Sequence, residues 1–210
     1  MFHRLSVVCA ALALALLLVP SALAVKVHVR VEGKDRTIFG AAAPTIDVTS
    51  PRANALPESA LDALESASVL GEFYYHVTTT SFGPYVDQVG RYGGTASSGW
   101  VFKVDDASPP VGADKVQLKD GDRVLWYYAT FGPTGGPPTL RVKAAAKKGC
   151  YTATAYDDSG KAVSAGAVQW HVGSKKTVSA MYGANFCPGK HTGLLIRATA
   201  TGAVRSNAVA

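Results

Sequence analysis

Residues 25–31 show strict alternation of hydrophobic and polar positions, with a valine at every second residue. A period of two is typical of a β-strand with one buried and one solvated face. The Glu32–Asp35 stretch that follows is turn-like. We expect further strands after it, over residues 36–39, 45–48, 73–79 and 85–89. The first part of the chain is therefore predicted to form a sheet.

A helical period occurs once, over residues 56–70. Its apolar residues recur every three or four positions, at Leu56, Ala60, Leu64, Ala67 and Leu70. Pro57 suits the first turn of a helix, and Gly71 suits its end. A second stripe is acidic, and we interpret it as the solvated face of the helix: Glu58, Asp62 and Glu65. This helix is long enough to lie across one sheet.

Residues 98–128 contain two of the three tryptophans and the strongest turn signal. We predict strands over 98–104 and 123–128, with a third over 113–118. Asp120-Gly121 between charged neighbours is typical of a two-residue hairpin turn. Strands, one helix and further strands predict an α+β domain, in which the helix covers one face of a mixed sheet.

Side-chain parity divides the aromatic residues of this sheet into two sets. Trp100 and Phe102 share one face of their strand. Trp126 and Tyr128 share a face of the last strand, opposite Tyr127. Because one helix covers only one face, the aromatic residues of the other face must contact the linker, a second domain or a ligand.

Proline and glycine interrupt the pattern at 132–138, which we interpret as a linker. Beyond it the pattern is entirely β, with strands expected over 140–144, 151–156, 167–172, 194–198 and 203–209. Regularly spaced short strands favour a small sandwich. The predicted organisation is a signal peptide (1–24), an α+β domain (25–131), a linker (132–138) and an all-β domain (139–210).

The first residues are typical of a secretory signal peptide. Arg4 precedes an apolar run, and Ala22-Leu23-Ala24 is a small-residue cleavage signal. We therefore expect export, cleavage before Val25 and a secreted or cell-surface protein that does not span the membrane. Retention of the segment as an anchor is the alternative.

Charge is divided unevenly between the two predicted domains. Residues 25–138 contain 10 lysines and arginines and 13 acidic residues, whereas residues 139–210 contain 10 and 2. The basic half could hold an anionic wall polymer through exposed lysines. We assign that role to Lys147, Lys148, Lys175 and Lys176; an ordinary solvated surface is the alternative.

Two cysteines remain after the predicted cleavage site, Cys150 and Cys187. An even pair in an exported chain predicts a disulfide. No histidine neighbours them at metal-ligand spacing, so we predict no metal site.

The catalytic motifs with a known mechanism are absent from the sequence. We find no G-x-S-x-G, H-E-x-x-H or phosphate-binding loop, and the histidines are scattered. We therefore predict that the protein is not an enzyme. An aromatic–basic nucleic-acid motif is also absent, and we expect no nucleic-acid partner and a monomeric protein.

Four short motifs occur in the order found in a known family: ALDAL (60–64), YVDQVG (85–90), SGWVFKV (98–104) and LKDGDRVLWYY (118–128). Together they resemble the transcobalamin C-terminal-like domain, a β-grasp-like module of cobalamin carriers and secreted bacterial proteins. The similarity covers roughly residues 25–131. The family usually has Asn-Gly after the SGWVFKV strand, where this chain has Asp105-Asp106.

This resemblance implies a β-grasp-like fold and makes a corrinoid one candidate ligand. In the vitamin carriers the domain caps the corrinoid against a helical barrel, which this chain lacks. Residues 157–173 and 193–210 look like the Ig-like or carboxypeptidase-regulatory-like domains of bacterial surface proteins, which implies attachment or spacing.

Two functions remain as hypotheses. In the first, an aromatic sheet face binds a small molecule or a partner protein through Trp100, Phe102, Trp126, Tyr128 and Tyr75. Such sites combine apolar walls with few polar groups. In the second, these aromatics are packed shut, and the protein is a structural surface or wall-associated module whose basic half docks on anionic polymer.

Overall fold

The computed structural model describes residues 24–49, 56–133, 135–181 and 183–210. The predicted signal peptide lies outside the described residues except for Ala24. The described part is mostly β, with one α-helix and four sheets. No described helix is both long and apolar enough to cross a bilayer.

The main sheet of the N-terminal half has the strand order β2-β1-β8-β7, and β3 also pairs with β1. Strand β1 runs parallel to β8, whereas β7 runs antiparallel to it. The strands are β1 (Lys26–Glu32), β2 (Thr37–Phe39), β3 (Thr45–Asp47), β7 (Ser98–Val104) and β8 (Arg123–Thr130). The sheet is therefore mixed, as the sequence predicts, and β7 forms one edge.

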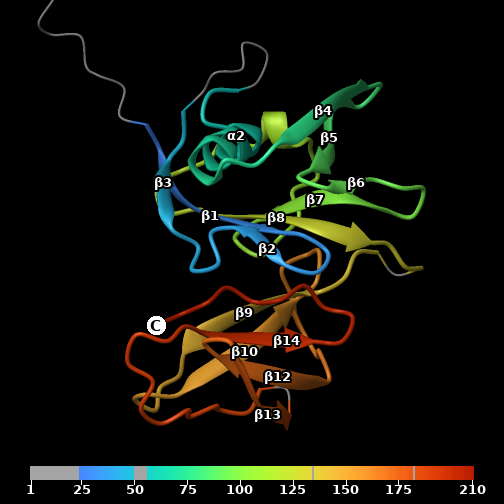
Figure 1. Ribbon diagram of the computed structural model, residues 1–210. Helices are drawn as coiled ribbons and strands as arrows, with labels where there is room; N and C mark the ends of the chain where they lie inside the picture. The colour runs from blue at the N-terminus through green and yellow to red at the C-terminus, as the bar shows by residue number, and fades with distance from the viewer. Residues whose placement is uncertain (1–23, 50–55, 134, 182) are drawn as a thin grey trace, which may run out of the picture.

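Helix α2 (Ala60–Gly71) covers one face of this sheet, in the upper part of Figure 1. Ser59 is its N-cap: its hydroxyl accepts a hydrogen bond from the Asp62 amide, and the Asp62 carboxylate accepts one from the Ser59 amide. This reciprocal pair satisfies two amides at the helix start. The helix begins later than the predicted Leu56, because Glu58 has a positive φ of 58° and Ser59 is extended.

The cap also corrects the interpretation of the acidic stripe. Asp62 is fully buried, and Glu65 accepts a hydrogen bond from the Tyr75 hydroxyl. Their positions in the helical period predicted that both side chains would be exposed to solvent. Local capping and a neighbouring strand decide their environment instead.

A second sheet of three strands continues from the helix. It contains β4 (Tyr75–Thr80), β5 (Gly83–Val89) and β6 (Tyr92–Gly93), joined as antiparallel neighbours. Strand β6 lies between the predicted strands 85–89 and 98–104, where no strand was predicted. Strand β5 passes close to β7 without pairing with it, since the two belong to separate sheets.

The predicted strand over 113–118 is a short 3₁₀ helix, η1 (Ala113–Lys115), followed by one isolated bridge from Gln117. Asp120-Gly121 does form a turn, and Asp122 donates its amide to the Lys119 carbonyl. The turn leads directly into β8, whose antiparallel partner is β7. The two-residue hairpin lies instead at Asp105-Asp106, where both residues have positive φ.

The C-terminal half consists of two three-stranded sheets, β11-β10-β9 and β13-β12-β14. Their strands are β9 (Thr139–Ala144), β10 (Tyr151–Tyr156), β11 (Ala162–Val163), β12 (Ala167–Val172), β13 (Lys175–Met181) and β14 (Ile196–Ala200). Residues 203–209, predicted as a strand, contribute only isolated bridges at Val204 and Val209.

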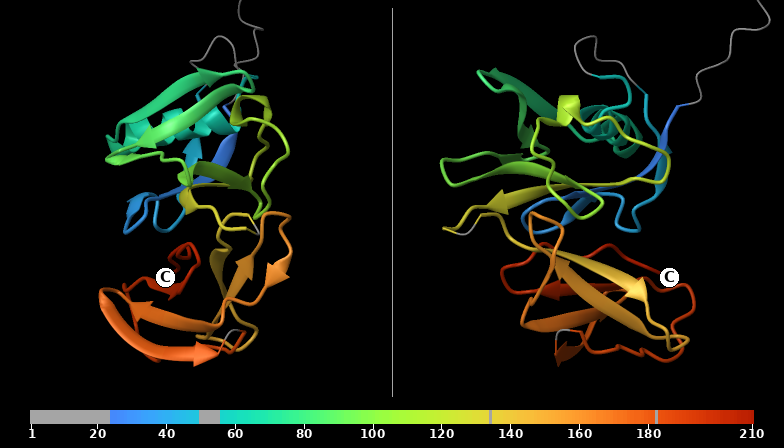
Figure 2. Two further views of the ribbon diagram at one scale, coloured as in Figure 1. Left: turned by 90° about the vertical axis from the view of Figure 1, so that its right-hand side faces the viewer. Right: turned by 180° about the vertical axis from the view of Figure 1, so that it is seen from behind.

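A separate core fills this half, with Trp170 stacked on Phe186 at 4.7 Å between ring centroids. Cys150 and Cys187 form the predicted disulfide. In Figures 1 and 2 the C-terminal half lies below the main sheet, on the side opposite α2. The second face of the sheet is thus turned toward the other half of the molecule.

Candidate functional site

A cleft of about 330 Å³ lies at the β7 edge of the main sheet; we call it the edge cleft. Strand β5 contributes Tyr85 and Val86 to its lining, and the segment from Ser108 to Ala113 closes another side. Phe131 and Asp158 complete it, and Asp158 belongs to the C-terminal half. The cleft exists only because four distant segments meet at one sheet edge.

Apolar aromatic side chains line the inner end of the edge cleft. Phe102 and Trp126 are stacked, with ring centroids 5.1 Å apart. The indole nitrogen of Trp126 donates to the Ala60 carbonyl at 3.2 Å, and that of Trp100 donates to the Tyr92 carbonyl at 2.8 Å. Trp100 and Trp126 are only 1% and 2% exposed, and both indole N–H groups are satisfied by backbone, so the two rings form a buried apolar wall behind the cleft.

The polar groups of the edge cleft gather around Asp158. Its Oδ1 accepts hydrogen bonds from the Ser108 and Tyr127 hydroxyls, each at 3.4 Å. Its Oδ2 accepts the Gly136 amide at 3.2 Å. Burial and the nearby Asp158 carboxylate raise the pKa of Tyr127, so this phenol stays protonated and donates. The cleft thus has apolar walls and one small polar corner.

Tyr85 supplies a second polar group at the other side of the cleft. Burial raises the pKa of its phenol, which also accepts a hydrogen bond from the Trp100 backbone. A Cβ placed on Gly99 would lie only 2.3 Å from the Tyr85 hydroxyl. Gly99 is therefore required for this close approach of β5 to the sheet edge.

The structure brings three of the five predicted ligand residues to the edge cleft: Trp100, Phe102 and Trp126. Tyr128 does not line it; its hydroxyl donates to the Gly93 carbonyl, and its ring lies edge-on to Trp100. Tyr75 lies on β4 and does not line the cleft; its hydroxyl donates a hydrogen bond to the Glu65 carboxylate. Sequence parity paired Trp100 with Phe102 and Trp126 with Tyr128 within their strands. The register of β7 on β8 puts all four on one face, which packs under α2.

Two residues of the cleft had no sequence signal. Asp158 follows a predicted strand, Ser108 precedes Pro109-Pro110, and neither residue type in that position indicates a binding site. Only the contact between the two halves brings these residues together.

The opposite face of the sheet is joined to the C-terminal half by a buried lysine. Lys103 on β7 is fully buried, and its Nζ donates to the Tyr156 and Asp157 carbonyls at 3.0 and 2.7 Å. It also lies 3.5 Å from Asp158 Oδ1 and 3.3 Å from Thr139 Oγ1. Burial lowers the pKa of Lys103, and the Asp158 carboxylate counteracts that shift.

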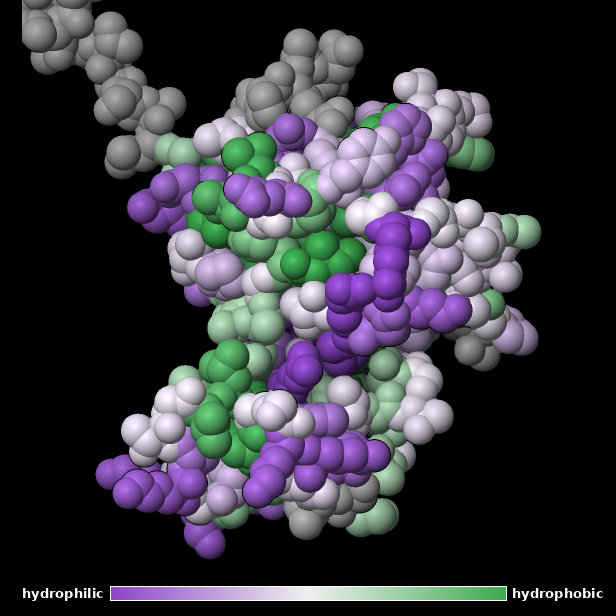
Figure 3. Space-filling model, in the orientation of Figure 1, coloured by the Kyte–Doolittle hydropathy of each residue, from purple (hydrophilic) through white to green (hydrophobic). Residues whose placement is uncertain are grey.

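A second ionic contact lies farther along the same face. Arg30 and Glu32 on β1 are buried and paired at 3.0 Å, and Arg205 of the C-terminal half pairs with Glu32 at 3.3 Å. The Arg30 guanidinium also donates a hydrogen bond to the Arg205 carbonyl, and the Arg205 guanidinium donates one to the Gly33 carbonyl, so both bonds cross the boundary. Figure 3 shows hydrophilic residues running across this boundary on one side of the molecule.

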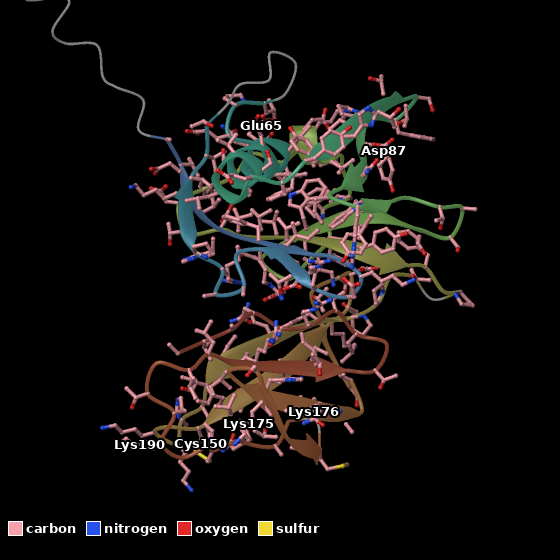
Figure 4. All side chains as sticks on the ribbon, in the orientation of Figure 1. Glu65, Asp87, Cys150, Lys175, Lys176 and Lys190 are labelled. Atoms are coloured by element: carbon pink, nitrogen blue, oxygen red, sulfur yellow. A yellow bond between two sulfur atoms is a disulfide. The ribbon has the colours of Figure 1, made fainter. Side chains whose placement is uncertain are left out.

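The predicted anion-binding lysines lie away from this boundary. Lys147, Lys148, Lys175 and Lys176 are all exposed. In Figure 4, Lys175, Lys176, Lys190 and Cys150 lie in the lower part of the C-terminal half, away from the N-terminal half. Asp157 and Asp158, the only acidic residues after position 138, both contact Lys103 at the opposite end. These labelled lysines therefore lie at the end of this half that is away from Asp158.

Comparison with known families gives one match. The model of a family described as a domain of unknown function, DUF4430, matches residues 58–130. This family is a transcobalamin-like domain. The match covers about a third of the chain and spans α2 through β8. No curated protein matches the chain.

Proposed function

We propose that the protein is an exported, non-catalytic binding module whose edge cleft takes a compact, largely apolar ligand. The observation that carries this proposal is the combination of apolar walls, one polar corner and a volume of about 330 Å³. Ligand pockets have this composition and range from about 300 to 1,000 Å³. The cleft lies at the lower end, which favours a ligand smaller than a corrinoid.

The family match supports the finer assignment of the fold. We propose that the N-terminal half is a β-grasp-like domain, since its mixed sheet is crossed by one helix on one face. We propose an Ig-like sandwich for residues 139–210, because two three-stranded sheets enclose the Trp170 core. Both modules are binding or spacing elements rather than catalytic frameworks.

Tryptophan fluorescence tests the edge cleft directly. Trp100 and Trp126 line it, whereas Trp170 lies in the separate core of the other half. The purified protein is titrated with cobinamide, haem, and an apolar naphthalene dye. We expect a saturable change with the dye. An unchanged tryptophan fluorescence with all three probes would contradict the proposal.

Two phenylalanine variants provide a matched pair for this experiment. Phe131 lines the cleft and is 44% exposed, whereas Phe82 is 92% exposed and lies outside it. We expect Phe131→Ala to weaken dye binding by about tenfold, since a lost aromatic contact removes about 1.4 kcal/mol or more. Phe82→Ala should leave it unchanged. Equal effects of both variants would assign the dye to general surface binding.

A second function has its own supporting observation. We propose that the C-terminal half docks on anionic polymer, because basic residues far outnumber its two acidic residues and Lys147, Lys148, Lys175 and Lys176 are exposed. Attraction of this kind is screened by salt. Binding to an isolated anionic polymer that stays equally strong from low to high salt would contradict it.

A further inference from the structure

Three basic side chains lie in one row across β13, β12 and β14. The strand register places Lys176 directly opposite His171, and His171 directly opposite Arg197. Like charges in directly opposed positions of a sheet destabilise it. In the part of the chain that the structure describes, neither Lys176 nor Arg197 forms an ion pair with a carboxylate. Lys176 and Arg197 therefore carry positive charge on this sheet face without a carboxylate partner among the described residues.

This row continues into a groove of about 560 Å³ at the boundary of the two halves. His171, Arg197 and Thr199 line one side, and Lys34, Tyr128 and Thr130 line the other. The groove is larger and more polar than the edge cleft. It also contains Tyr128, the predicted ligand residue that the edge cleft leaves out.

The carboxylates near the groove are already matched by other groups. Asp35 lines it, accepts hydrogen bonds from Tyr92 and Arg91, and lies 3.8 Å from Arg36. Glu32 is buried against Arg30 and Arg205. The positive charge of Lys34 and Arg197 in the groove is thus left for a ligand.

We propose that this boundary groove binds an acidic polysaccharide. Its carboxylates lie against Lys34 and Arg197, and a sugar ring lies against Tyr128 and the threonine hydroxyls. Arginine recognises carboxylates through paired N–H groups, and tyrosine offers an apolar ring with a polar tip. An anionic polymer without sugar rings would make no contact with Tyr128 and the threonine hydroxyls on the other side of the groove. The inference rests on the second function proposed above and names its polymer.

Calorimetric titration of the purified protein with short polygalacturonate chains tests this inference. Neutral dextran and polyphosphate serve as comparisons, at about 0.1 M salt, where the screening length is about 10 Å. We expect polygalacturonate to bind more tightly than polyphosphate, and dextran not to bind. Polyphosphate binding as tight as that of polygalacturonate would overturn the assignment to a polysaccharide.

Two double variants with the same loss of charge locate the binding surface. Lys34→Ala with Arg197→Ala removes two groups of the groove, and Lys115→Ala with Lys119→Ala removes two exposed lysines outside it. The groove pair should weaken polygalacturonate binding at least about tenfold, because hydrogen bonds to charged groups contribute about 1.5–3 kcal/mol each. The control pair should change it less than about threefold.

The outcomes separate the groove from the broader function. Equal weakening by both pairs would overturn the groove and leave docking on anionic polymer in place. Failure of the unaltered protein to bind either anionic chain would overturn both.

Discussion

Individual charged residues in this protein act mainly where the two halves meet. Lys103 is the clearest case: a lysine with no exposed surface whose ammonium is held by two carbonyls, a hydroxyl and Asp158. Within the strand 98–104 it is one polar residue between Phe102 and Val104. Its parity placed it on the second sheet face, and the partner from the other half explains why a charge is tolerated there.

We predict that Lys103→Met destabilises the protein by about 3 kcal/mol. The substitution keeps an apolar stem but leaves the Tyr156 and Asp157 carbonyls buried without this donor, and it removes the partner of Asp158. Urea unfolding measures the change. Lys119→Met, at an exposed turn, is the control and should stay within about 0.5 kcal/mol. Equal stability of the two variants would contradict the assigned role of Lys103.

His171 gives a prediction about pH. Partial burial lowers the pKa of its imidazole, and Arg197 and Lys176 lower it further. In the unfolded chain a histidine titrates near pH 6.5. As the pH falls below about 6.5, the unfolded state takes up this proton before the folded state does, so stability decreases toward the lower folded pKa.

The melting temperature should therefore decrease as the pH is lowered from about 7.5 to about 5. NMR titration of the His171 ring measures its pKa directly. Arg197→Gln removes one neighbouring positive charge. We expect it to raise the pKa of His171 and to make the dependence of stability on pH shallower. A pKa of His171 that does not move in this variant would exclude the cross-strand coupling.

At the level of elements, most strands form where the alternating pattern predicts them, and the exceptions show where strand pairing decides the outcome. The predicted strand at 203–209 makes only isolated bridges. The predicted hairpin at Asp120-Gly121 is instead a turn that leads into β8, because β8 pairs with β1 and β7 rather than with the segment just before the turn. Local turn chemistry predicted the bend, whereas strand pairing depended on segments about a hundred residues away.

The disulfide is the element-level feature with the largest expected effect on stability. Cys150 and Cys187 are 37 residues apart in the chain. Closing a loop of that length restricts the unfolded chain and contributes about 4 kcal/mol in the chain-entropy account. Reduction should therefore lower the melting temperature of the C-terminal half. Calorimetry with and without a thiol reductant measures it, and superimposable curves would contradict the prediction.

At the level of the whole molecule, the two halves are joined by buried charges rather than by a continuous apolar core. The two hydrophobic clusters are separate. Between them lie the Lys103–Asp158 contact and the Arg30–Glu32–Arg205 contact. Domain interfaces of a polar kind often allow relative motion. Here the buried ions fix the register of one half on the other, and this register forms both the edge cleft and the boundary groove.

We predict a single thermal unfolding transition for the disulfide-bonded protein, because each half stabilises charges buried by the other. Replacing both Lys103 and Arg205 with methionine should separate it into two transitions. Differential scanning calorimetry resolves them. One transition in the double variant would show that other contacts couple the halves.

The sequence by itself determined the local features of this protein. Several features follow from side-chain period and covalent chemistry: the valine alternation at 25–31, the helical period within 56–70, the pairing of the cysteines, and the shared faces of Trp100 with Phe102 and of Trp126 with Tyr128. These features depend on neighbours close along the chain or on one unambiguous partner. The sequence also showed the aromatic strands, the excess of positive charge in the second half and the division into two differently patterned halves.

Only the tertiary structure decided which face is closed and where a ligand fits. Helix α2 covers the tryptophan face, and Lys103 and Glu32 close the other against the C-terminal half. The edge cleft needs Asp158 beside β7, and the boundary groove needs Arg197 beside Tyr128. These pairs are far apart in the sequence, and no periodicity encodes them. They depend on how two separately patterned halves dock through buried charges.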